Sequence, residues 1–186
     1  MSDMRTSALP GAEFAGFVTV REAGCQGMIT LRGDINVLGE AITQATGCAL
    51  PDQRRVTRHA DCAVAWMSPD EVLILCPHGD APKLEATLSE AFAGEFVTLA
   101  NVSDARAVFT LSGTLWRDAL AKLCPVDFSR LTEGDIRRTR AAQVAAAIWV
   151  SGPETATLIC FRSVAGDMFD LLRTASARGS EPGLHG

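Results

Sequence analysis

The feature that most limits how this chain can fold is an internal repeat. Matching segments follow in the same order, namely Phe17–Leu31 against Phe96–Leu111, Arg55–Arg58 against Arg137–Arg140, Trp66 against Trp149, and Cys76 against Cys160. The offset between matched residues grows from 79 at Phe17 and Phe96 to 84 at Cys76 and Cys160. Small loop insertions between two copies of one unit produce such a steady drift. The sequence therefore predicts a duplicated unit.

Each copy reads as two strands, a helix, a hairpin and a closing helix. In the first copy, β-branched segments at 17–23 and 27–31 predict strands. Apolar residues then recur at helical spacing over 35–45, between an expected N-cap at Asp34 and a stop at Gly47. The second copy repeats the pattern, with Thr114 as the expected helix cap.

One segment, 140–150, is rich in Ala and Val and would suit a helix by propensity. Its counterpart, 56–67, leads directly into the turn Ser68-Pro69-Asp70, which indicates a hairpin. We therefore predict that both segments are extended.

These patterns predict an α+β fold in which two ββαββα-type units, with room for an extra short strand, form one pseudo-symmetric domain. We place the first repeat at 16–95 and the second at 96–175. The polar or Gly/Pro-containing ends, 1–15 and 176–186, are expected to be disordered tails.

Charge, hydropathy and cysteine content argue against several classes of protein. The net charge of −5 opposes binding to a phosphate backbone. No apolar run approaches the roughly 18–20 residues of a membrane span, and the N-terminus lacks a signal pattern, so we expect a cytoplasmic protein. The six cysteines form no CxxC pair and are expected to be small buried apolar residues.

The usual motifs for nucleotide, phosphate and zinc-protease sites do not occur in the chain. Cys76-Pro77-His78 brings a thiol near an imidazole, but we expect a buried cysteine beside an exposed histidine. His59, Asp61 and Cys62 would point to both faces of a strand, which argues against a metal site. We predict no catalytic, cofactor-binding or metal-binding residue. Trp66 and Trp149 lie in apolar segments and are expected to be core residues.

Two arginine clusters lie at matching places in this acidic chain, and they are the candidate partner-interface residues: Arg54, Arg55, Arg58, Arg137, Arg138 and Arg140. Arginine favours protein interfaces, so the clusters could dock against acidic patches of another subunit. The same residues would also suit solvated edge strands, where charge prevents edge-to-edge pairing. The sequence leaves both interpretations open.

The segments Asn101–Arg106 and Val108–Gly113 resemble the folate-binding domain of the glycine-cleavage T-protein. The continuation, Leu120–Asp127 with Gly134 and Arg138–Val144, resembles the gamma subunit family of heterotetrameric sarcosine oxidase. The resemblance implies a T-protein-like duplication with exchanged first strands. It also implies alpha, beta and delta subunits as partners in a complex that oxidatively demethylates sarcosine to glycine, with hydrogen peroxide and methylene-tetrahydrofolate as the other products. FAD, FMN, NAD, zinc and tetrahydrofolate are expected on those other subunits.

The chain departs from the T-protein pattern where paired acidic residues help to hold folate. Residues Ala141–Ala147 contain no carboxylate, and the first copy has only Asp61. We therefore expect a non-catalytic gamma subunit that serves assembly and stability. The alternatives are a folate-binding, aminomethyltransferase-like enzyme and a stand-alone regulatory domain that binds a small molecule.

Overall fold

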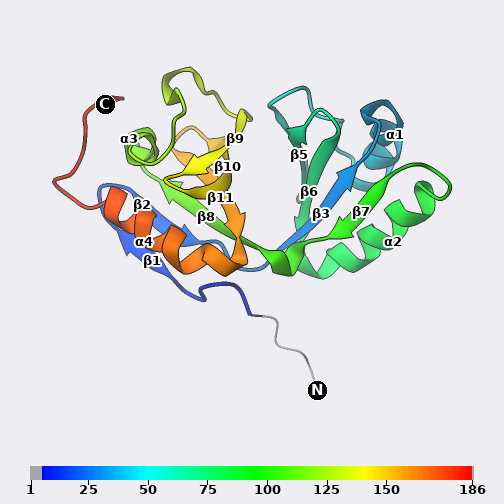
Figure 1. Cartoon of the computed structure of the whole chain (residues 1–186), viewed down its shortest axis with the longest axis horizontal. Coiled ribbons are helices and arrows are strands. Elements are labelled where there is room, and N and C mark those ends of the chain that lie inside the picture. The colour runs from blue at the N-terminus through cyan, green and yellow to red at the C-terminus, as the bar shows by residue number, and fades with distance from the viewer. Residues whose placement is uncertain (1–5, 186) are drawn as a thin grey trace. The chain divides into compact units, whose positions relative to one another are not determined.

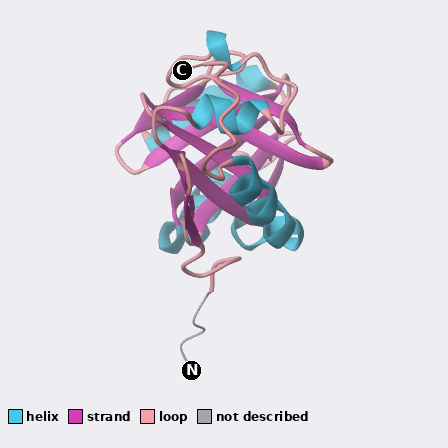
Figure 2. Cartoon of the chain, turned by 90° about the vertical axis from the view of Figure 1, so that its left-hand side faces the viewer, coloured by secondary structure: helices cyan, strands magenta, loops and turns pink. Residues whose placement is uncertain are grey.

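The computed structural model describes residues 6–185 and divides the chain into two compact units. One unit is built from Gln26–Ser103, and the other combines the residues up to Cys25 with those from Asp104 onward. Each unit contains one antiparallel sheet and two α-helices (Figures 1 and 2). Buried residues of each sheet pack with the two helices of the same unit. Among residues 6–185, no helix has the length and apolar character needed to cross a membrane.

The discontinuous unit holds a six-stranded sheet. Its spatial order is β1 (Glu13–Ala15), β2 (Thr19–Glu22), β8 (Arg106–Ser112), β11 (Thr155–Phe161), β10 (Val144–Gly152) and β9 (Ile136–Ala141). The helices α3 (Trp116–Ala121) and α4 (Ala165–Ala175) supply Trp116, Leu120 and Leu172 to its core, and all three side chains are fully buried. Trp116 meets Phe128 edge to face, with 5.9 Å between the ring centroids.

The continuous unit holds a five-stranded sheet. Its order is β4 (Val56–His59), β5 (Cys62–Ser68), β6 (Glu71–Pro77), β3 (Gln26–Arg32) and β7 (Thr98–Asn101). The helices α1 (Ile35–Thr46) and α2 (Ala81–Ala91) bury Leu38, Ile42 and Leu88 against alternate residues of the sheet. Side chains alternate between the two faces of a strand, so one face of each strand meets this core.

The first strands of the two sequence copies are exchanged. β2 belongs to the first copy but pairs with β8 of the second, with Thr19 opposite Ser112. β7 opens the second copy but pairs with β3 of the first, with Thr98 opposite Arg32. The predicted α+β fold of duplicated units is therefore confirmed, and each copy does contain the extra short strand, β4 or β9.

Local signals in the sequence account for several elements. The Asp34 carboxylate accepts a hydrogen bond from Asn36 N–H at 2.9 Å and caps α1, and Gly47 ends that helix at φ 73°. The ambiguous segment 140–150 is extended, as predicted, and forms the end of β9, a hairpin turn and most of β10. The predicted cap at Thr114 is wrong, because α3 starts at Trp116 after a turn in which Trp116 N–H donates to the Gly113 carbonyl.

The expectation of disordered tails is wrong for the described residues. Residues 1–5 and 186 lie outside them, but Glu13–Ala15 forms β1 because its backbone pairs with β2. At the other end, Ser176 is fully buried, and Lys122 Nζ donates to the Ala175 carbonyl and to Ser180 Oγ. Backbone and side-chain partners elsewhere in the unit therefore order both segments.

Candidate partner interface

The two arginine clusters lie on the edge strands of the two sheets, or directly before them. Arg54 and Arg55 precede β4, and Arg58 lies within it, at the outer edge of the five-stranded sheet. Arg54 and Arg58 are exposed, and Arg54 has a left-handed backbone at φ 62°. This edge therefore presents positive charge to the solvent.

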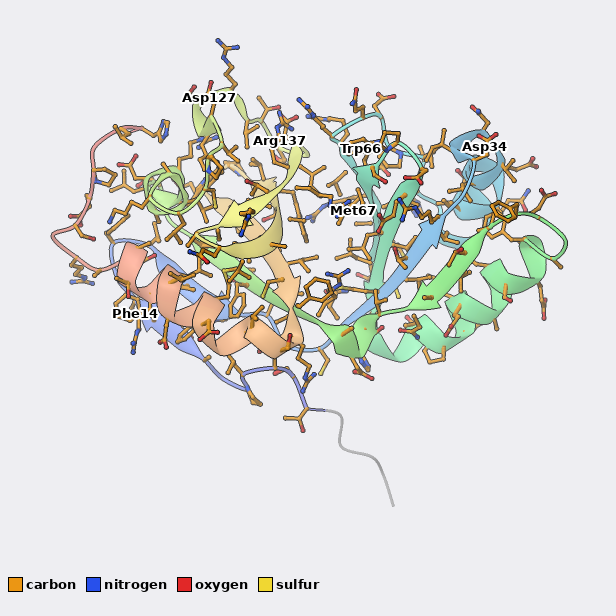
Figure 3. All side chains as sticks on the ribbon, viewed as in Figure 1. Phe14, Asp34, Trp66, Met67, Asp127 and Arg137 are labelled. Atoms are coloured by element: carbon orange, nitrogen blue, oxygen red, sulfur yellow. The ribbon has the colours of Figure 1, made fainter. Side chains whose placement is uncertain are left out.

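The second cluster lies on β9, at the outer edge of the six-stranded sheet (Figure 3). Arg137 lies opposite Ile148, on the face that carries the core. Its side chain is only 26% exposed, its Nη1 donates to the Ile136 carbonyl at 2.8 Å, and it lies 3.7 Å from Asp135 Oδ1. Arg138 and Arg140 are on the opposite face and exposed. Arg137 is thus held within the chain, whereas its two neighbours present charge outward.

Both interpretations of the clusters agree with an edge position. An edge strand offers unpaired backbone groups to another chain, and long charged side chains along it resist unspecific pairing. The same charges would match an acidic patch on a specific partner. The role of these arginines as a docking surface remains a prediction.

The structure does not assemble a nucleophilic site at Cys76-Pro77-His78. Cys76 is buried at the end of β6, and burial, followed by weaker effects of Cys62 and Asp80, raises the pKa of its thiol to about 11. Such a thiol stays protonated near neutral pH and is a poor nucleophile. His78 lies in a 3-10 turn, η1 (His78–Asp80), directly after the strand.

No group of three or more potential metal ligands gathers anywhere in residues 6–185. Of the candidate ligands from the sequence, His59 places its imidazole ring against Gly47, so close that a Cβ added at Gly47 would overlap the ring. Asp61 is exposed at the tip of the β4–β5 hairpin. These residues serve packing and a turn.

The two tryptophans differ in burial. Trp149 on β10 is 4% exposed, whereas Trp66 on β5 is half-buried. Trp66 pairs with Val72 next to a β-bulge, and in the second copy Val150 pairs with Ala156 next to the matching bulge. The structural counterpart of Trp66 is therefore Val150, and matching the two tryptophans on the sequence is off by one residue.

The hairpin that departs from the T-protein pattern joins β9 to β10. Its turn residue Ala142 has a left-handed backbone at φ 51°, and Ala60 at the tip of the matching β4–β5 hairpin has φ 47°. Its side chains from Ala141 to Ala147 are apolar except for Gln143. A carboxylate for a folate ring is therefore not provided by this hairpin.

Sequence reasoning missed a second surface, at β7. Phe96, directly before this strand, has a fully exposed side chain. It lines an open pocket of about 460 Å³ whose other lining residues are Arg32, Gly33, Asp34, Asp70, Glu95, Val97 and Thr98. Arg32 Nε donates to Asp70 Oδ2 at 2.8 Å, and this bond, together with one from Ser68, lowers the pKa of Asp70 to about 2. A comparison of Phe96 with Phe17 on the sequence could have found the position but not its exposure.

The description "Sarcosine oxidase, gamma subunit family" belongs to the family model that matches residues 32–178, which is more than half of the chain. A sarcosine oxidase subunit gamma from Arthrobacter sp. is 31% identical over 153 residues, covering 80% of this chain and 74% of that protein. Its counterpart from Corynebacterium sp. (strain P-1) is 29% identical over the same length.

Solved structures agree with the sequence comparison. A chain of the heterotetrameric sarcosine oxidase from Corynebacterium sp. U-96, in complex with pyrrole 2-carboxylate, matches with a TM-score of 0.80 and 27% identity, over 88% of this chain and 87% of that one. The aminomethyltransferase T of the glycine cleavage system from Bartonella henselae matches with a TM-score of 0.61 and 14% identity, over 82% of this chain and 45% of that one, and shares the fold. The chain belongs to the sarcosine oxidase gamma subunit family.

Proposed function

We propose that this chain is the non-catalytic gamma subunit of a cytoplasmic, heterotetrameric sarcosine oxidase-like complex. The observation that carries the proposal is the match to a chain of the Corynebacterium sp. U-96 enzyme, which extends over nearly the full length of both chains. A match that covers both chains so completely supports the same place in an assembly, rather than a shared module in an unrelated protein.

The reaction that we propose for the complex is the oxidative demethylation of sarcosine to glycine, with hydrogen peroxide and methylene-tetrahydrofolate as the other products. FAD, FMN, NAD, zinc and tetrahydrofolate would be bound by the alpha, beta and delta subunits. Two features of this chain support the assignment of the cofactors and the chemistry to the other subunits. The thiols of Cys76, Cys124 and Cys160 have raised pKa values because they are buried, which makes them poor nucleophiles. The β9–β10 hairpin lacks a carboxylate for the pterin ring.

The role that we propose for the chain itself is assembly and stability. Its sheets end in edge strands, and exposed arginines lie on β4 and β9, where a neighbouring subunit could reach both the backbone and the charge. Arg58 and Arg140 are exposed, and reversing their charge would test whether acidic patches of a partner meet these edges.

The test is co-expression of the tagged chain with the proposed alpha, beta and delta subunits, followed by affinity purification and an absorption spectrum. We expect stoichiometric larger subunits and flavin bands in the eluate. The variants Arg58→Glu and Arg140→Glu should lower the recovery of these subunits, whereas Arg173→Glu on α4, also exposed, serves as a control.

A colourless, well-behaved single chain would contradict the proposal. Titration of the isolated chain with a reduced folate separates the remaining alternative, because micromolar binding would favour a folate-dependent enzyme. Without such binding, a ligand-induced shift in the melting temperature of the isolated chain would point to a regulatory domain.

A further inference from the structure

The duplication provides an internal comparison between the two exchanged strands, β2 and β7. Each is the first strand of its copy, and each pairs on one side with the sheet of the other copy. On its other side, β2 pairs with β1, with Phe14 opposite Val20. In the described part of the chain, no strand lies on the corresponding side of β7, which ends the five-stranded sheet. One of two equivalent edges is therefore covered and the other is bare.

The backbone of β7 is oriented for the same pairing. Toward β1, the Val18 carbonyl accepts from Gly16 N–H and Glu22 N–H donates to the Ala12 carbonyl, so alternate residues from Val18 to Glu22 face β1. Their counterparts at an offset of 79 are alternate residues from Val97 to Asn101. Val102 N–H donates to the Met28 carbonyl of β3, which fixes the alternation. Leu99 therefore directs its backbone N–H and carbonyl groups away from β3.

The side chains next to β7 are also less covered than those next to β2. Val18 and Val20 are 2% and 0% exposed, whereas their counterparts Val97 and Leu99 are only half-buried. A groove of about 460 Å³ lies there, lined by Val97, Leu99 and the α2 residues Pro82, Glu85, Ala86 and Ser89. In the other unit, β1 places the half-buried Phe14 directly opposite Val20, on the same face of the sheet (Figure 3). An apolar side chain opposite Leu99 would fill the groove in the same way.

Phe96 shows the same contrast with its counterpart Phe17. The Phe17 side chain is half-buried against its core, its N–H donates to the Ser176 carbonyl at 2.9 Å, and Lys122 Nζ lies 5.1 Å from the ring centroid. Phe96 is 100% exposed. A bare aromatic ring beside an open strand edge is unusual for a surface that only meets water, and aromatic residues are enriched at protein interfaces.

Charge indicates the chemistry of what would cover this edge. The residues that line the two pockets beside β7 include one cationic side chain, Arg32, and it forms an ion pair with Asp70. Asp34 and Glu95 in one pocket and Glu85 in the other leave a negative charge in both linings. A covering segment that carries lysine or arginine would complement this charge. One such cation could lie over Phe96, as Lys122 lies over Phe17.

We propose that the open edge of β7 receives an extended, basic segment of another subunit, which adds to the five-stranded sheet as a sixth strand. An apolar side chain of that segment enters the groove between α2 and β7, and a lysine or arginine packs on Phe96. This is strand addition, in which backbone hydrogen bonds give affinity and side-chain pockets give specificity. The proposal rests on the proposed function, because it assigns the occupant to another subunit of the complex.

A second copy of this chain suits the edge less well. Symmetric pairing of two β7 strands would bring the carboxylates of Glu85 and Glu95 from both copies together. Pairing of β7 with the basic β4 edge of another copy is head-to-tail, and such contacts form open-ended chains unless the rotation closes a ring.

The first experiment identifies the occupant directly. A photo-crosslinking phenylalanine analogue replaces Phe96 in the tagged chain, which is co-expressed with the alpha, beta and delta subunits. Full exposure of Phe96 means that the larger side chain fits without disturbing the fold. We expect crosslinks to one basic, extended stretch of another subunit. The same analogue at Leu184, which is 65% exposed, is the control for random contacts. Crosslinks to a second copy, or none above those from position 184, would overturn the proposal.

The second experiment separates docking from folding. Phe96→Ser and the double variant Glu85→Lys/Glu95→Lys should lower the recovery of the other subunits by roughly tenfold or more, the usual effect of losing an interface anchor. The melting temperature of the isolated Phe96→Ser chain should be unchanged, because Phe96 makes no buried packing to lose. Phe17→Ser, at the covered counterpart, should instead lower that melting temperature. Leu184→Ser should change neither quantity.

The outcomes of the two proposals are distinguishable. If the wild-type chain recovers no flavin-bearing subunits, the proposed function fails and this inference fails with it. If the wild-type chain recovers them and the β7 variants recover them equally well, the proposed function stands and only the strand-addition site is refuted.

Discussion

The two alanines at the hairpin tips yield a quantitative prediction. Ala60 and Ala142 have φ values of 47° and 51°, in the left-handed region that disfavours any residue with a Cβ. That conformation costs a non-glycine residue about 1–2 kcal/mol. Glycine would remove this cost, but the greater conformational freedom of glycine in the unfolded chain offsets about 0.4–1 kcal/mol of the gain. We therefore expect Ala60→Gly and Ala142→Gly each to raise the free energy of unfolding by roughly 0.5–1 kcal/mol.

Urea denaturation at fixed pH measures the effect as a higher midpoint with an unchanged m-value. The two alanines lie in different units, so the double variant should gain about the sum of the single changes. Ala145→Gly is the matched control, because Ala145 is exposed on β10 without a left-handed backbone, and it should lose roughly 0.5–1 kcal/mol. If Ala142→Gly destabilises the chain as much as Ala145→Gly does, the assigned strain at the hairpin tip is refuted.

Two further predictions concern buried groups. Burial raises the pKa of Cys124 to about 12, whereas the thiol ionises near about 8.5 in the unfolded chain. The contribution of this thiol to the free energy of unfolding should therefore be fully present below about pH 8.5 and fall as the pH rises toward its pKa in the folded chain. A lower urea midpoint at pH 10 would detect the fall. Cys124→Ala should lessen it, and an equal fall in that variant would contradict the assignment. Gly47→Ala should lose about 2 kcal/mol, because Gly47 ends α1 at φ 73° and a Cβ there overlaps His59. Adding His59→Ala to Gly47→Ala should recover the steric part of this loss in thermal unfolding, and no recovery would show that the ring does not obstruct the Cβ.

Several features could be predicted because their signals lie within a few residues of one another. The cap at Asp34, the helical period after it and the stop at Gly47 together specify α1 without reference to the rest of the chain. The repeat resolved the ambiguous segment 140–150, since a copy of an extended segment is expected to be extended. The family resemblance could also be predicted, because the residues that carry it lie along the second copy, between Asn101 and Val144. The family model that matches residues 32–178 supports it.

Other features depend on contacts between residues far apart in the sequence. An alternating strand such as β2 carries no local signal for which sheet it joins. Only the family resemblance implied the exchange of the first strands, and the tertiary structure shows it in the pairing of β2 with β8 and of β7 with β3. The order of residues 176–185 depends on partners such as Lys122 and Asp118, which lie more than 50 positions away.

By itself, the sequence determined that this protein is a duplicated α+β chain with two matched arginine clusters and a recognisable family. The tertiary structure decided which matched residues are equivalent in their surroundings. Phe17 and Phe96 occupy the same place in the repeat, yet Phe17 packs against the core beneath Lys122 and bonds to Ser176 after α4, whereas Phe96 is fully exposed. The exposure of a side chain depends on all the residues packed around it, many of them distant in the sequence. A local sequence pattern therefore cannot predict it.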